Sequence, residues 1–231
     1  MSTKQRRSRG TGAPGTHLKV VTPPRMYVLA GVNGAGKSSL GGAAVRELGG
    51  DYYNPDEIAR ILKVKHSELG QTEANSKAWL IGKKLLEKAI ANRLDFAFES
   101  TLGANTIPVL LRDAAQTGYE IHVWYAGLSN PELHLERVRS RVRKGGHDIP
   151  EADIRRRYEH SRLNLINLLP HLAVLYVYDN SVDADPATGA APEPALVLHM
   201  ERGRILNVAD LPNTPVWAKP IVAAAVKLNV G

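Results

Sequence analysis

The stretch 28-VLAGVNGAGKSSL-40 decides the fold, because an apolar run leads directly into the spacing GxxxxGK[ST]. Gly31, Gly36, Lys37 and Ser38 in that spacing are typical of a phosphate-binding loop between a strand and a helix. Glycines let backbone N–H groups converge on phosphate oxygens, and the helix N-terminus adds a favourable dipole. The motif therefore predicts a nucleoside triphosphate site, and it leaves the reaction open.

The loop predicts a role for each of its polar side chains. We expect Lys37 to bridge the β- and γ-phosphates, Ser38 to ligate Mg²⁺ and Ser39 to reach the α-phosphate. Ser38 is the predicted metal ligand, and Mg²⁺ with the nucleotide is the predicted cofactor. The nucleotide-binding residues predicted from the loop are Gly31, Val32, Asn33, Gly34, Ala35, Gly36, Lys37, Ser38 and Ser39.

The basic charge of the chain belongs to its first residues. Of a formal net charge of +7, most comes from Lys and Arg that precede the first acid, Glu47, so the rest of the chain is nearly neutral. Residues 1–24 are rich in Ser, Gly, Pro and Arg and predict a disordered basic tail. Arg6 and Arg7 are not followed by the apolar run of an export signal, and no run reaches transmembrane length. The absence of cysteine fits the cytoplasm, which is the expected location.

Apolar runs alternate with helical patterns along most of the 231 residues, which is typical of βαβ units and a parallel sheet. We predict a three-layer α/β fold of the P-loop kinase type with a mostly parallel central sheet. The predicted core covers 25–181 and includes an Arg-rich helical lid over 131–169, and 182–231 is a linker, a hairpin and a helix packed on the core. The predicted strands are 25–30, 51–53, 95–99, 119–126 and 172–178, with a hairpin over 195–208. The predicted helices are 36–48, 55–63, 71–93, 105–117, 131–144, 151–169 and 216–228.

Two carboxylates follow predicted strands at the edge where an open α/β sheet binds its ligands. Asp56, in 52-YYNPDEIA-59, could orient or deprotonate an acceptor hydroxyl, or cap the helix that follows. Glu99, in 96-FAFESTL-102, could bind an acceptor hydroxyl or a magnesium-bound water, or be a buried structural acid. The residues alone leave both pairs of alternatives open.

The Arg-rich stretch 137-RVRSRVRKGGHDIPEADIRRRY-158 is either a solvated surface or a lid over phosphates. Gly145 and Gly146 supply a hinge between two arginine-bearing helices, and three consecutive arginines over 155–157 cannot all point away from the body. The guanidinium fork binds phosphate through two hydrogen bonds. We therefore favour the lid, with His147 as a hydrogen-bonding lid residue and not a metal ligand.

Other nucleotide-using classes find less support. A GTPase would need the guanine-reading NKxD, which does not occur. A motor or ABC-type ATPase usually shows an apolar strand that ends in Asp, and the only such ending is 175-LYVYD-179. Asp179 is therefore either a magnesium-holding acid or a helix or loop cap.

With these residues collected, the chain resembles the zeta-toxin family and its relatives among the small P-loop kinases. The likeness runs from about residue 25 to residue 181. It is carried by AGVNGAGKSS, NPDEIA, FAFESTL, RVRSRVRKGGHDIP with IRRRY, and YDNS, and the lid phrase joined to RRRY and DNS is its most specific part.

The resemblance implies transfer of the γ-phosphate of ATP to a hydroxyl of a small metabolite. In characterised zeta toxins that hydroxyl is the sugar 3′-hydroxyl of UDP-N-acetylglucosamine, and a protein antitoxin is the partner. The stretch over residues 63–93, where the acceptor is expected, shows no match to a uridine or N-acetyl pocket. Toxicity does not follow from the resemblance.

The family motifs also imply roles for residues of this chain. Asp56 is similar to the family's base, and Lys37 to its phosphate lysine. The resemblance makes a magnesium role for Asp179 less favoured. The remaining implied residues are Glu99 and Thr101 for the acceptor, Arg141, Arg157, Arg143 and Arg156 in the lid, and Asn180 near the adenine.

Three functions stay in competition at this point. The first is a kinase of a small hydroxylated metabolite, most favourably a nucleotide sugar. The second is a kinase of nucleic-acid 5′ ends gripped by the basic tail, which the low aromatic content (6%) does not favour. The third is a non-catalytic ATP-binding module that switches a partner. The expected partners are a small-molecule acceptor and an antitoxin, without nucleic acid or a membrane.

Overall fold

The computed structural model describes residues 22–37, 40, 52–182, 193–210 and 212–230. Most of the predicted tail (1–24), most of the predicted helix over 36–48 and most of the linker before the hairpin lie outside the described residues. Ser38 and Ser39 lie outside them too, so the roles predicted for these serines stay predictions.

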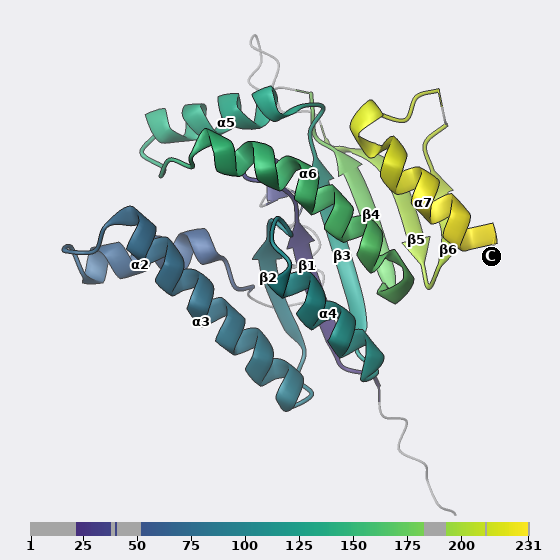
Figure 1. Ribbon diagram of the computed structural model, residues 1–231, viewed down its shortest axis with the longest axis horizontal. Helices are drawn as coiled ribbons and strands as arrows, with labels where there is room; N and C mark the ends of the chain where they lie inside the picture. Colours follow the sequence, from purple (N-terminus) through teal and green to yellow (C-terminus); the bar gives the residue numbers. More distant parts are fainter. Residues whose placement is uncertain (1–21, 38–39, 41–51, 183–192, 211, 231) are drawn as a thin grey trace, which may run out of the picture.

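A six-stranded mixed sheet forms the centre of the molecule, in the order β2-β1-β3-β4-β5-β6 (Figure 1). Strands β2, β1, β3 and β4 run parallel, and β5 and β6 continue the sheet as an antiparallel hairpin, which confirms the predicted mostly parallel sheet. The strands are β1 (Arg25–Ala30), β2 (Phe96–Ser100), β3 (Glu120–Gly127), β4 (Val174–Asp179), β5 (Ala195–Glu201) and β6 (Arg204–Val208).

The strand predicted over 51–53 is reduced to a single bridge among the described residues. Tyr53 pairs in parallel with Phe98 of β2, and its backbone N–H donates to the Ala97 carbonyl at 2.9 Å. Asn54 and Pro55 then turn the chain into a helix, and because proline has no N–H the pairing ends there.

Six longer helices surround the sheet in the described part of the chain. Figure 1 shows α4, α6 and α7 lying across one face of the sheet, with α2 and α3 beside β2. Apolar residues of α4, α6 and α7 pack with those of β1, β3, β4 and β5 in one core cluster. The helices are α2 (Pro55–Lys65), α3 (Gln71–Ala91), α4 (Thr106–Gln116), α5 (Pro131–Arg143), α6 (Glu151–Leu168) and α7 (Lys219–Val230), with short 3₁₀ turns at Leu169–His171 and Val216–Ala218.

An Asn-Pro pair starts two of the helices that approach the site. Asn54 Oδ1 accepts the backbone N–H of Asp56 at 2.9 Å and that of Glu57 at 3.4 Å, and Pro55 is at the first helical position. Asn130 caps α5 in the same way. Asparagine is a strong N-cap and proline suits the first turn. The cap of α2 is thus Asn54, and the alternative in which Asp56 is the cap is wrong.

The C-terminal part of the chain is fastened to the end of β4. The Trp217 ring lies against Gly127, where an added Cβ would meet ring carbon at 2.1 Å, and its Nε1 donates to Asp179 Oδ1 at 3.1 Å. The same oxygen accepts the Ser181 hydroxyl. Asp179 therefore accepts hydrogen bonds from neighbouring side chains, and the two roles predicted for it stay predictions.

Candidate active site

The glycine loop leaves the end of β1 and lies tightly against neighbouring strands. Gly31 has φ +138°, and a Cβ there would lie 2.3 Å from the Ala126 carbonyl oxygen. Gly36 has φ +82°, and a Cβ there would lie 2.3 Å from Asn180 Nδ2. An L side chain is strained at such angles and would have no room, so these two positions require glycine. The loop can therefore lie directly against β3 and the residue after β4 only with glycine at these two positions.

Two side chains from other elements hold the loop backbone. His134 of α5 is 1% exposed, and its Nδ1 lies 2.9 Å from the Asn33 carbonyl oxygen, which can only accept a hydrogen bond. Burial lowers the pKa of His134 to about 4, so the imidazole is neutral at pH 7 and carries its proton on Nδ1. Asn180 Nδ2 donates to the Ala35 carbonyl at 2.9 Å. Asn180 therefore supports the loop, and its predicted place near the adenine stays a prediction.

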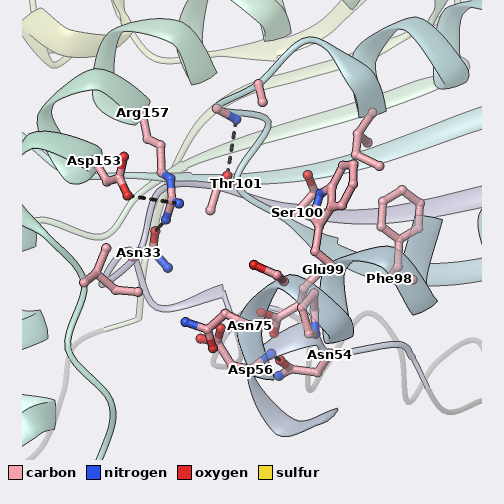
Figure 2. A pocket seen from close by; sticks show the side chains of 18 of the residues that line it. Asn33, Asn54, Asp56, Asn75, Phe98, Glu99, Ser100, Thr101, Asp153 and Arg157 are labelled. Atoms are coloured by element: carbon pink, nitrogen blue, oxygen red, sulfur yellow. Dashed lines mark hydrogen bonds and ion pairs between the residues drawn. The ribbon is translucent and has the colours of Figure 1, made fainter. Parts of the chain in front are cut away.

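Arg157 connects α6, which belongs to the predicted lid, to the loop. Its Nη1 donates to Asn33 Oδ1 at 2.7 Å, and its Nη2 lies 3.8 Å from Asp153 (Figure 2). The stem of Arg157 packs on Gly103, where an added Cβ would come within 2.5 Å of Cγ. Burial lowers the pKa of this guanidinium, which nevertheless remains a cation.

Arg141 faces the predicted base. Its Nη1 donates to Asp56 Oδ2 and its Nη2 to the His147 carbonyl, both at 3.3 Å. His147 Nε2 is 3.7 Å from Asp56 Oδ1, and burial lowers the pKa of His147. Within the described ranges there is no group of three or more His, Asp or Glu side chains that could hold a metal ion, and the lid role of His147 stays a prediction.

Other arginines of the lid point elsewhere. Arg156 is exposed and pairs with Asp153 at 2.7 Å, and Arg143 is exposed too. Arg155 bonds Glu132 and Glu151 and so fastens α6 to α5. Of the four predicted arginines, Arg157 alone lines the cavity. Arg141 lies outside the lining and reaches the site through its bond to Asp56, whereas Arg143 and Arg156 lie outside it too.

A single cavity of about 990 Å³ joins these parts. Figure 2 shows Asn33, Asp153 and Arg157 on one side of it and Asn54, Asp56, Asn75 and Glu99 on another. Glu99 is only 8% exposed, and Thr101 Oγ1 accepts the Gly103 N–H at 3.2 Å. The predicted site residues that line the cavity are Asn33, Lys37, Asp56, Glu99, Thr101 and Arg157.

The wall formed by α3 was not predicted from the sequence. Asn75 and Trp79 line the cavity from α3, and Phe98 and Tyr53 lie in the same lining. The helical spacing over 71–93 predicted a packed apolar stripe of Ala74, Ala78, Ile81, Leu85 and Ile90. The structure buries Ala74 and Ala78 with Leu86 and Ala89, and it leaves Ile81 and Leu85 exposed. No motif marked the polar residues beside that stripe. His134 was missed for the same reason, because one histidine in an amphipathic helix gives no signal of its partner.

A glycine loop at the carboxyl edge of a parallel sheet, with Arg157 bonded to the loop and Arg141 bonded to a carboxylate beyond it, is the arrangement of a P-loop phosphotransferase. The zeta toxin family model matches residues 16–182, and the chain belongs to the zeta-toxin family. The match confirms the resemblance to this family, and membership of the family supports the prediction that the protein is an ATP-dependent kinase.

Individual proteins are similar to this chain in sequence or in fold. The chain is 34% identical over 132 residues to an uncharacterised protein of Haemophilus influenzae, a stretch that is 55% of this chain and 88% of the relative. Its fold is similar to the AvrRxo1-ORF1:-ORF2 complex solved with ATP, at TM-score 0.62 and 14% identity, covering 87% of this chain and 63% of that one. It is also similar to the PezAT toxin–antitoxin system of Streptococcus pneumoniae, at TM-score 0.58 and 15% identity, covering 93% and 89%.

Among the residues that the structure describes, no helix has both the length and the apolar character that crossing a bilayer requires.

Proposed function

We propose that the protein is a kinase that transfers the γ-phosphate of ATP to a hydroxyl of a nucleotide sugar, with UDP-N-acetylglucosamine as the first candidate. The observation that carries the proposal is that Lys37, Arg157, Asp56 and Glu99 line one cavity. Phosphoryl transfer depends on cations around the moving group and on a carboxylate that orients the acceptor, and this cavity holds both.

In the proposed reaction the acceptor oxygen attacks the γ-phosphorus as the bond to the ADP oxygen breaks. Asp56 takes the proton of the acceptor hydroxyl, and Arg141, 3.3 Å away, holds the carboxylate in position. Lys37 and Arg157 offset the negative charge on the transferred group. Glu99 binds the acceptor, with Thr101 beside it. The attacking and leaving oxygens would then lie in line across the cavity.

Mg²⁺ is proposed as the metal that accompanies ATP. It would neutralise charge on the β- and γ-phosphates, with Ser38 as its proposed protein ligand. The donor chemistry fits, because a serine hydroxyl and phosphate oxygens are the hard ligands that Mg²⁺ prefers. Cavity residues Asp56 and Glu99 add carboxylates that could hold its bound waters.

A metabolite panel tests the proposal. Purified protein, ATP and Mg²⁺ are incubated with UDP-N-acetylglucosamine and other hydroxylated metabolites, and products are read by mass spectrometry against Asp56→Ala. A gain of one phosphate on the nucleotide sugar, absent in the variant, supports the proposal. A gain on another metabolite keeps the kinase and removes the nucleotide sugar.

If no metabolite is phosphorylated, two other activities are tested with the same protein. Phosphate transfer to oligonucleotide 5′ ends, with binding that weakens steeply with salt and is lost on deleting residues 1–24, would indicate a nucleic-acid kinase. ATP binding with no product of either kind would indicate a switch module.

A protein antitoxin is the proposed partner. The support is family membership and the pneumococcal relative, which is described as a chromosomal toxin–antitoxin system. Expression in a bacterial host with and without the neighbouring reading frame tests this, and growth that is equal in both cases contradicts it.

A further inference from the structure

The inner side of α3 presents polar side chains to the cavity beside an aromatic one. Gln71 and Asn75 are four residues apart, so they lie one above the other on the same face of the helix, and Trp79 follows one turn later. All three line the cavity. Trp79 is 41% exposed, so its ring is accessible to a ligand.

A chain of hydrogen bonds fixes the orientation of the Asn75 amide. Lys63 Nζ lies 3.0 Å from Gln71 Oε1, and Gln71 Nε2 lies 2.9 Å from Asn75 Oδ1. The oxygen and nitrogen of an amide are usually distinguished only by their partners. An ammonium group can only donate, so Gln71 must turn its oxygen to Lys63 and its NH₂ to Asn75. Asn75 must then turn its oxygen to Gln71.

The NH₂ of Asn75 is left facing away from Gln71. Among the residues that the structure describes, no hydrogen-bond acceptor is bonded to Asn75 Nδ2. Asn75 lines the same cavity as Asp56 and Glu99 (Figure 2). A donor with a fixed direction beside these two carboxylates complements a ligand atom that can only accept.

We propose that Asn75 selects the acceptor by donating to an amide carbonyl oxygen of the nucleotide sugar. This inference rests on the proposed function. A nucleotide sugar has two sources of such a carbonyl, the acetamido group of the sugar and the uracil ring. Trp79 and the neighbouring aromatic side chains supply the apolar surface on which either planar group would lie.

Two variants change the direction of the donor with little change in shape. Asn75→Asp replaces the donor by an acceptor. Gln71→Glu removes the donor to Asn75, and the new carboxylate accepts from both Lys63 and the Asn75 amide, which turns the Asn75 oxygen toward the cavity. The matched control is Lys77→Gln, a charge change on the same helix at a residue outside the cavity lining.

The kinetic experiment uses ATP with UDP-N-acetylglucosamine or UDP-glucose. In both donor variants we expect KM for UDP-N-acetylglucosamine to rise about tenfold or more, because a polar contact is lost and two acceptors then face each other. The kcat and the KM for ATP should stay within about twofold of wild type, the range of a near-neutral change. An equal rise in KM for UDP-glucose means that Asn75 binds the uracil carbonyl. A rise in KM confined to UDP-N-acetylglucosamine means that Asn75 binds the acetamido carbonyl. Parameters equal to those of Lys77→Gln overturn the inference.

An NMR measurement separates this inference from the proposed function. Hydrogen exchange of the Asn75 side-chain amide is followed in protein without ligand. Fast exchange in wild type and protection in Gln71→Glu support the orientation even if no nucleotide sugar is phosphorylated. Protection already present in wild type overturns the inference, whatever the kinase assay gives.

Discussion

The loop end of the cavity, formed by residues 31–37, is held by side chains from three separate parts of the chain. His134, Arg157 and Asn180 reach it from α5, from α6 and from the residue after β4. The α3 end, formed by Gln71, Asn75 and Trp79, is held by hydrogen bonds within the α2–α3 pair. We infer that the loop end is fixed before a nucleotide binds, whereas the α3 end sets which acceptor is chosen.

Asp56 stands between these ends and gives the largest expected effect. Asp56→Asn keeps the shape and removes the base, so kcat should fall about a hundredfold or more, equivalent to about 2.7 kcal/mol in the barrier. ATP affinity, measured by calorimetry, should be unchanged, because the loop end does not depend on Asp56. A parallel loss of ATP affinity would show that nucleotide binding at the loop end depends on Asp56, which would contradict the separation of the two ends.

The neutral histidine at the loop end makes stability depend on pH. The pKa of His134 is lowered to about 4, so between pH 6.5 and 4 the unfolded chain binds a proton that the folded chain does not. Stability therefore falls as pH drops through this window, by about 2 kcal/mol at pH 5 relative to pH 7. Besides the burial that dominates, Lys37 and Arg137 also disfavour the imidazolium.

The substitution His134→Asn isolates the contribution of the imidazole to the pH dependence of stability. The asparagine side-chain amide can still donate to the Asn33 carbonyl oxygen, but it does not titrate. Urea unfolding at pH 7 and pH 5 should show a smaller loss for this variant than for wild type. His160→Asn on the exposed face of α6 is the control. Equal pH dependence of His134→Asn and wild type would show that His134 is not the buried neutral group.

The sequence predicted the loop end better than the α3 end, and the reason is physical. The glycine spacing follows from backbone geometry that only those residues allow, so it is visible in the motif. The cap of α2 was missed, because only Asp56 was considered for it, although Pro55 at the first helical position leaves Asn54 as the cap.

The α3 residues that line the cavity could not be predicted from a motif in this way. Periodicity locates the side of a helix that packs on the core, but the cavity lies next to that side and is bounded by α6 and by the loop after β2. Asn75 and Trp79 come to share one cavity with Arg157 only when these distant segments assemble. The same holds for His134, whose partner is 101 residues away along the chain.

A substitution at Gly103 tests whether the loop end and the α3 end of the cavity are mechanically coupled. Gly103→Ala would place a Cβ 2.9 Å from the Cβ of Arg157 and 3.3 Å from its Cα, so α6 itself must shift. We expect kcat to fall about tenfold, or about 1.4 kcal/mol, because small misplacement of a charge-bearing group is costly. Gly70→Ala is the control, since a Cβ there meets nothing within 4 Å. Equal kcat for both variants would mean that Arg157 does not act in transfer.

Removing the asparagine caps of the two Asn-Pro pairs should have the smallest effect. The two substitutions compare the α3 end of the cavity directly with the loop end. Asn54→Ala and Asn130→Ala each remove a cap worth about 1 kcal/mol. Of the eleven residues of α2, all of them described, Ala59 alone is buried, whereas α5 buries His134, Leu135 and Val138. Losing the cap of α2 should therefore open that helix locally, and losing the cap of α5 should lower global stability. Hydrogen exchange confined to α2 in Asn54→Ala, with its urea midpoint nearly unchanged, would sharpen the comparison; an equal midpoint shift in both variants would show that the α3 end is held as firmly as the loop end.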